Sequence, residues 1–181
     1  MIGPSNSGKT SLLCRLKWLS RNHVHLSGDK TDIELPVLPA TLPTVGTNIE
    51  TLAFPNAEGT VPTTIQLREK GGAMAPVWAS YYSDAACFLY VIDSSDPHRL
   101  SESTVLLLEV LGHPKMQGKL GAVLFNKSDV KGALPFSDIS AIMRLDDVLG
   151  SSSINLSVFH TSAATNDGVS EVLRWIESAV R

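Results

Sequence analysis

The sequence predicts an α/β fold with a mostly parallel sheet of six strands and about five flanking helices. Residues 86–92 and 121–125 are continuous apolar runs, which are typical of strands buried on both faces of a parallel sheet. Segments with helical periodicity alternate with such runs along the chain. The 181 residues are enough for one domain, residues 1–181, with a well-buried core.

The first helix is expected at about residues 9–20, directly after a glycine-rich loop. We expect Arg15 and Lys17 to face water, opposite an apolar side that consists of Leu12, Leu13, Leu16 and Trp18. Residues 27–45 then contain three well-spaced prolines, Pro36, Pro39 and Pro43, which oppose regular structure. The sequence therefore predicts a long loop after the first helix.

Two alternating segments, residues 47–54 and 63–68, predict an antiparallel pair of strands joined by a turn at 55–59. The buried strands at 86–92 and 121–125 follow, and a last strand is expected at 154–160. These segments, together with a strand that feeds the glycine-rich loop, make up the six expected strands.

The helices of the second half have recognisable start signals. Asp96 is expected to cap a helix that begins at Pro97 and continues through Leu111. Ser137 is expected to cap a helix that ends near residue 150, and Asp167 to cap the last helix. The last helix has an apolar stripe at i, i+3, i+4 and i+7, formed by Val169, Val172, Leu173 and Ile176.

The glycine-rich loop, residues 3–10, has the pattern G-x-x-x-x-G-K-T of a phosphate-binding loop. Its glycines let successive N–H groups point at phosphate oxygens, and the following helix directs its positive dipole end at the same anion. Lys9 can reach the β- and γ-phosphates, and the Thr10 hydroxyl can bind Mg²⁺. The predicted contact residues are Gly3, Ser5, Asn6, Ser7, Gly8, Lys9, Thr10 and Ser11.

A second motif, Asn-Lys-Ser-Asp at residues 126–129, directly follows a predicted strand. The carboxylate of Asp129 can accept hydrogen bonds from N1–H and the exocyclic amine at C2 of guanine, and adenine has neither a proton at N1 nor an amine at C2. The two motifs together, in this order and more than 100 residues apart, predict a guanine-nucleotide site.

The composition excludes several other classes of protein. The net charge is −3 without a basic run, so nucleic acid is not an expected partner. No apolar stretch is long enough to span a membrane. Cys14 and Cys87 lie in apolar patterns and are expected to be buried, reduced thiols.

Only Met1 and Ile2 precede the glycine-rich loop, although the strand that feeds such a loop is normally central in the sheet. We therefore expect a truncated first strand. A void should result between the first and last helices, at a cost of several kcal/mol.

The order of these motifs resembles the Arf branch of the small GTPases in the Ras superfamily. The resemblance covers nearly the whole chain. It rests on the glycine-rich loop, Pro-Thr-Val-Gly at 43–46, Gly71-Gly72, the stretch 76–82, the motif at 126–129 and Thr-Ser-Ala at 161–163. It implies a small G domain, a molecular switch that binds GTP or GDP with Mg²⁺.

The resemblance also implies roles for individual residues. Thr44 would bind Mg²⁺ when GTP is present, and the N–H of Gly72 would contact the γ-phosphate. Three side chains would hold the base, those of Asn126, Lys127 and Asp129. The backbone N–H groups of Ser162 and Ala163 would face the guanine O6 atom.

The family context extends to partners and location. It implies an effector, an exchange factor and an activating protein, and a cytoplasmic protein recruited to membranes or the cilium for traffic. No lipidation motif or amphipathic anchor is visible in this sequence.

Several residues depart from the family pattern Trp-Asp-x-Gly-Gly-Gln. Arg68, Glu69 and Ala73 replace the Trp, the Asp and the Gln. Alanine cannot orient the attacking water, so we expect weak intrinsic hydrolysis. Glu69 can either hold a metal-bound water or crowd the site.

The effector surface and the loop before it also differ from the family. Of three aromatic residues that the family uses to bind effectors, only Tyr81 remains, because Thr47 and Arg68 occupy the other positions. The loop before Thr44 is longer than the family norm. It is either a tolerated surface insertion or a partner-specific first switch.

Two other functions are consistent with parts of the pattern. Ala73 also fits a scaffold that holds GTP with negligible hydrolysis and acts only through protein interactions. A nucleoside or nucleotide kinase would use the glycine-rich loop too, but it would carry an arginine-rich lid and no guanine motif.

Overall fold

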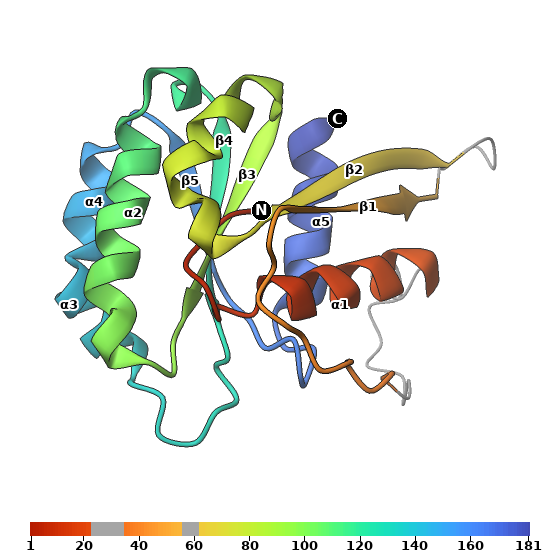
Figure 1. Ribbon diagram of the computed structural model, residues 1–181, viewed down its shortest axis with the longest axis horizontal. Helices are drawn as coiled ribbons and strands as arrows, with labels where there is room; N and C mark the ends of the chain where they lie inside the picture. Colours follow the sequence, from red (N-terminus) through yellow and green to blue (C-terminus); the bar gives the residue numbers. More distant parts are fainter. Residues whose placement is uncertain (23–34, 56–61) are drawn as a thin grey trace.

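The computed structural model describes residues 1–22, 35–55 and 62–181. Its elements alternate between helix and strand as predicted (Figure 1). In chain order they are α1 (Lys9–Asn22), β1 (Thr47–Phe54), β2 (Thr63–Lys70), the 3₁₀ segment η2 (Gly72–Asp84), β3 (Cys87–Asp93), η3 (Pro97–Arg99), α2 (Leu100–Gly112), η4 (Pro114–Met116), β4 (Leu120–Asn126), α3 (Phe136–Met143), α4 (Leu145–Ser151), β5 (Asn155–His160) and α5 (Val169–Val180).

The strands form two sheets that meet at the start of the chain. β1 and β2 pair antiparallel, and β3, β4 and β5 form a parallel sheet. Met1 accepts a hydrogen bond from the Lys70 N–H at 2.9 Å, while Ile2 donates to the Leu89 carbonyl and accepts from Val91, each at 2.9 Å. The described residues thus form five strands, and Met1 and Ile2 hold the sixth position between β2 and β3.

Helices cover both faces of the parallel sheet, and each face has its own apolar core. α2, α3 and α4 lie on one side and α1 and α5 on the other (Figure 1). Alternate residues of β3 serve the two cores: Tyr90 and Ile92 pack under α2, and Leu89 and Val91 pack under α1 and α5. This double cover explains why β3 and β4 are continuous apolar runs.

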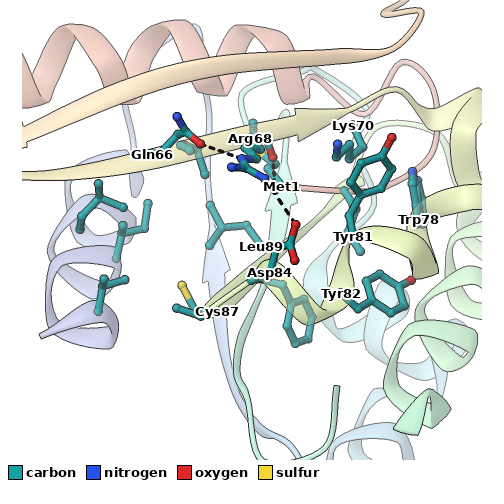
Figure 2. Close-up of a pocket in the computed structure, with 18 of the residues that line it drawn as sticks. Met1, Gln66, Arg68, Lys70, Trp78, Tyr81, Tyr82, Asp84, Cys87 and Leu89 are labelled. Carbon is teal, nitrogen blue, oxygen red and sulfur yellow. Dashed lines mark hydrogen bonds and ion pairs between the residues drawn. The ribbon is translucent and has the colours of Figure 1, made fainter. Parts of the chain in front are cut away.

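A cavity of about 360 Å³ lies between β2 and β3, beside Met1 and Ile2 (Figure 2). Arg68 of β2 and Asp84, at the end of η2, form an ion pair at 3.8 Å beside it. The expected void between the first and last helices is wrong, because α1 and α5 pack against each other in one core cluster. The space lies between the edges of the two strands instead.

Two predicted helix starts are wrong, and each error has a local backbone cause. The helix expected over residues 137–150 is broken at Arg144, which adopts a left-handed conformation with φ 48° between α3 and α4. α3 begins at Phe136 without a cap from Ser137. α5 begins after Gly168 rather than after a capping Asp167, because Gly168 takes the left-handed conformation at that position.

Other expectations of local structure have mixed outcomes. Asp96 accepts a hydrogen bond from the His98 N–H, as a cap should, and Pro97 follows it. Cys14 and Cys87 are free thiols but only half-buried. The turn at 55–59 and residues 27–34 of the long loop lie largely outside the described residues. No described helix is long and apolar enough to cross a membrane.

Candidate functional site

The glycine-rich loop lies beside the carboxyl ends of β3 and β4, the edge where parallel α/β sheets bind ligands. A cavity of about 320 Å³ opens there. Its lining comes from four separate segments: the glycine-rich loop and the start of α1, residues 41–44, Glu69 with Gly72, and Lys127. The structure therefore gathers most of the predicted phosphate and metal residues around one pocket.

Asn126 joins the glycine-rich loop to the base motif. Its Nδ2 atom donates to the Ser7 carbonyl at 2.9 Å, and its Oδ1 atom accepts from the Thr161 hydroxyl at 3.3 Å. Gly8 has φ +83°, and a Cβ at this position would lie 2.2 Å from Asn126 Nδ2. Asn126 is thus a buried structural link between three loops, and only a glycine leaves room for it.

The ammonium of Lys9, which is predicted to bind phosphate, contacts the backbone of the glycine-rich loop. Its Nζ atom donates to the carbonyls of Gly3 at 2.9 Å and Pro4 at 2.6 Å. Burial lowers the pKa of Lys9 from 10.5 to about 8, partly offset by the nearby carboxylate of Glu69. A buried cation of this kind favours an anionic ligand, because the anion restores the charged form.

Hydroxyl, carboxylate and amide groups converge at one end of the pocket. Glu69 Oε1 accepts from Thr10 Oγ1 at 2.6 Å and from Thr44 Oγ1 at 3.4 Å. The two hydroxyl oxygens are 3.1 Å apart, and Asn48 Nδ2 donates to Glu69 Oε2 at 2.8 Å. Three residues predicted to serve Mg²⁺ therefore contact one another.

The start of η2 packs directly on the glycine-rich loop. A Cβ on Gly72 would lie 2.1 Å from the Ser5 nitrogen, and a Cβ on Gly71 would lie 2.1 Å from the Thr44 carbonyl oxygen. Both positions therefore require glycine for close approach of the backbones. Ala73 follows at the pocket's edge with its side chain exposed.

A backbone hydrogen bond connects the base motif, residues 126–129, to the loop at residues 161–165. The Ser128 N–H donates to the Thr161 carbonyl at 3.2 Å, and Lys127 forms an ion pair with Asp93 at 2.6 Å. Asp129 remains exposed, so its carboxylate is accessible to a base. The Ser162 N–H donates to the backbone carbonyl of Asp167 at 2.9 Å, so a protein acceptor already occupies it. Within the described residues, the Ala163 N–H donates to no protein acceptor.

Arg15 is a site residue that the sequence reading misplaced. It is only 2% exposed, and its Nε atom donates to the Ala163 carbonyl at 2.9 Å. The expectation that it faces water is wrong, because it occupies the i+3 position of the buried stripe formed by Leu12, Leu16 and Leu19. This position within the apolar stripe is the sequence signal that indicates burial of Arg15.

Arg99 is a second residue that the sequence reading did not identify. Its Nη1 atom donates to the Ser5 carbonyl at 2.7 Å, while its Nε atom pairs with Glu102 at 3.0 Å. No sequence pattern indicates this contact, because 94 residues separate the two partners.

Two of the three positions of the expected effector surface, Thr47 and Tyr81, are connected through Lys70. Its ammonium lies 3.1 Å from the centre of the Tyr81 ring and donates to the Thr47 hydroxyl at 2.7 Å. A cation so close to the ring face is a favourable contact. The remaining aromatic ring is therefore partly covered by a charged side chain.

The fold and this pocket define a P-loop protein of the small GTPase class. The family model of the ADP-ribosylation factor family (Arf) matches residues 1–180. The chain therefore belongs to the ADP-ribosylation factor family, and it is a GTP-binding switch protein of that family.

Individual relatives agree with this assignment. ADP-ribosylation factor-like protein 16 of Homo sapiens is 33% identical over 181 residues, covering 100% of this chain and 85% of that protein. Residues 68–72, followed by Trp78 and the pair Tyr81 and Tyr82, predict a relative of this kind, and the match over the whole chain confirms that prediction. ADP-ribosylation factor-like protein 1 of Saccharomyces cerevisiae is 28% identical over 183 residues, covering 100% of this chain and 86% of that protein.

A solved structure supports the fold. The Arl6 BBS3 small GTPase of Trypanosoma brucei, with the bound nucleotide analogue GppNp, superposes with a TM-score of 0.72 at 26% identity. The alignment covers 100% of this chain and 95% of that one.

Proposed function

We propose that this chain is a Mg²⁺-dependent guanine-nucleotide switch with slow intrinsic hydrolysis that regulates intracellular membrane or ciliary traffic. The observation that carries the proposal is the pocket in which Lys9, Thr10, Thr44 and Gly72 converge from separate segments. In this proposal, Lys9 and the N–H groups of the glycine-rich loop hold the phosphates. Asp129 and the Ala163 N–H read the guanine.

The proposed switch depends on two segments that meet at the γ-phosphate end of the pocket. Thr44 would bind Mg²⁺ and the Gly72 N–H would bind the γ-phosphate, so GTP holds both segments more tightly than GDP does. When bound, Mg²⁺ would neutralise charge on the β- and γ-phosphates. The hydroxyls of Thr10 and Thr44 and the carboxylate of Glu69 are oxygen ligands of the kind Mg²⁺ prefers, so the residues present fit the ion.

Slow hydrolysis follows from Ala73, whose exposed methyl group cannot orient a water molecule. An activating protein would then have to supply the missing group, and an exchange factor would have to reload the site. The effector is expected to differ from those of other Arf proteins, because Lys70 covers the Tyr81 ring and Arg68 pairs with Asp84. Ala73 equally favours the second candidate, a GTP-holding scaffold with negligible turnover.

The first experiment measures binding of GTP, GDP and ATP to the purified protein with and without Mg²⁺. Single-turnover hydrolysis of bound GTP follows. We expect guanine-selective, Mg²⁺-dependent binding and very slow hydrolysis. Equal affinity for ATP would remove the base assignment. Hydrolysis that stays negligible with cell extract added would favour the scaffold.

Ala73→Gln should raise the single-turnover rate by about tenfold or more, because the amide can position the attacking water. The matched control is Ser80→Gln, an exposed position in the same 3₁₀ segment that does not line the nucleotide pocket. A wild-type rate that already equals the Ala73→Gln rate would contradict the proposed role of this position.

A further inference from the structure

The carboxylate of Glu69 lies at the place where the proposed Mg²⁺ ion has to bind. We propose that Glu69 is a direct ligand of this ion, without an intervening water, and that Asn48 is the residue that positions it. This inference rests on the proposed function, because it concerns the metal that accompanies the nucleotide. It concerns a glutamate where the family pattern has an aspartate.

The distances among the three oxygens support direct ligation. Thr10 Oγ1, Thr44 Oγ1 and Glu69 Oε1 are separated by 2.6, 3.1 and 3.4 Å. Mg²⁺ is octahedral with bonds of about 2.0–2.1 Å, so neighbouring ligands lie roughly 2.9 Å apart. The three oxygens therefore have the spacing of three adjacent corners of one octahedron.

A water-mediated arrangement would need a different spacing. In such an arrangement a water molecule, and not the carboxylate oxygen, would face both hydroxyl oxygens. Here Glu69 Oε1 itself faces both of them, at 2.6 Å from Thr10 Oγ1 and 3.4 Å from Thr44 Oγ1. The extra methylene of glutamate over aspartate accounts for this reach.

Glu69 lies near the Lys9 ammonium but does not contact it. Glu69 is 1% exposed, and within residues 1–22, 35–55 and 62–181 it forms no ion pair. Its other oxygen, Oε2, accepts from Asn48 Nδ2 at 2.8 Å. A buried carboxylate is stable when it is paired or coordinates a metal, and the amide fixes the orientation of the coordinating oxygen.

Asn48 also connects this carboxylate to the first switch. It belongs to β1, four residues after Thr44, and its Nδ2 atom is 3.5 Å from the Thr44 hydroxyl. The side-chain amide of Asn48 would therefore contact both Glu69 and Thr44, two of the residues around the metal. Asn48 acts through Glu69 and is a positioning residue.

The test counts the water molecules on Mn²⁺, a paramagnetic substitute for Mg²⁺, in the complex with GDP by electron spin-echo envelope modulation in D₂O. With Thr10, Glu69 and a phosphate oxygen bound, we expect about three waters on the six-coordinate ion in the wild type. Glu69→Asp, whose shorter carboxylate cannot reach the metal, should show one more water. A wild-type count of about four, unchanged in Glu69→Asp, would overturn the inference.

The positioning role is tested by Mn²⁺ affinity in the same GDP complex. Asn48→Ala should weaken Mn²⁺ binding by about tenfold, as removal of an outer-shell partner does. The control Asn155→Ala, an exposed asparagine at the start of β5, should leave the affinity unchanged. Equal Mn²⁺ affinity in wild type and Asn48→Ala would exclude the role of Asn48.

These results separate the inference from the proposed function. If the wild type does not bind GDP, the proposed function fails. If it binds GDP and Mn²⁺ with the larger water count, only the direct ligation fails. The water count of the wild type decides the question even if a variant does not fold.

Discussion

Arg15 is a buried cation that stabilises the loop on which base recognition would depend. Its Nε atom donates to the Ala163 carbonyl, and a second nitrogen donates to the Ala164 carbonyl at 3.4 Å. Because two consecutive carbonyls point at the guanidinium, the intervening backbone is held in one orientation. The neighbouring N–H groups are fixed by the same contacts.

Arg15→Ala should lower the free energy of unfolding by roughly 3 kcal/mol, because it removes charged hydrogen bonds and leaves a buried carbonyl unsatisfied. Lys17→Ala is the control on the same helix. Its half-exposed ion pair with Glu50 predicts a loss of about 0.5 kcal/mol. Urea denaturation measures both, and equal losses would mean that the Ala163 contact is not stabilising.

Asp129→Asn should shift the preference of the protein from guanine toward xanthine nucleotides. The exchanged amide donates where the carboxylate accepts, so it reverses the hydrogen-bond pattern offered to the base. Competition between GDP and XDP measures the shift, with Asp138→Asn in the first turn of α3 as the control. An unchanged GDP preference would remove Asp129 from the base site.

At the scale of elements, the break between α3 and α4 depends on one residue in an unfavourable conformation. Arg144 has φ 48° and ψ 48°, and its side chain forms an exposed ion pair with Asp147. Arg144→Gly should raise the free energy of unfolding by about 0.5–1 kcal/mol, since glycine adopts this conformation without a steric penalty.

The matched control for this prediction is Arg144→Ala, which removes the ion pair but keeps the strained backbone. Its stability should be equal to that of the wild type or slightly lower. Thermal or urea denaturation compares the three proteins. A glycine variant no more stable than the alanine variant would show that the conformation carries no cost.

The elements that the sequence predicts well are those whose burial is periodic. Residues 47–54 form β1 over the whole expected range, and the four residues predicted for the stripe of α5 are all buried. Arg144 and Gly168 were not foreseen, because their conformations depend on how two helices join rather than on local patterns.

The candidate site also has parts that the sequence predicts and parts that it does not. The glycine-rich loop and the motif at 126–129 are contiguous in sequence, so their chemistry is readable there. The contact of Glu69 with Thr10 and Asn48 is not, because it joins segments from three parts of the chain. The burial of Arg15 is not predicted, because a charged side chain is normally expected to face water.

For the whole molecule, Asn126 connects residues 119 and 35 positions away in the chain. Asn126→Ala should weaken GDP and GTP binding equally, by about tenfold or more, because the Ser7 carbonyl loses its buried donor. The preference for GDP over ADP should persist, since Asp129 is untouched. Fluorescent-nucleotide titration tests this, with exposed Asn22→Ala as the control. A changed base preference would place Asn126 in direct contact with the base.

The same asparagine makes the two halves of the site thermodynamically dependent on each other. A phosphate that orders the glycine-rich loop also fixes Ser7, and through Asn126 and Thr161 it orders the loop that would receive the base. Part of the entropy cost of binding is then shared between the two ends of the ligand. Guanosine and pyrophosphate, offered as separate molecules, should consequently bind cooperatively, each raising the affinity of the protein for the other.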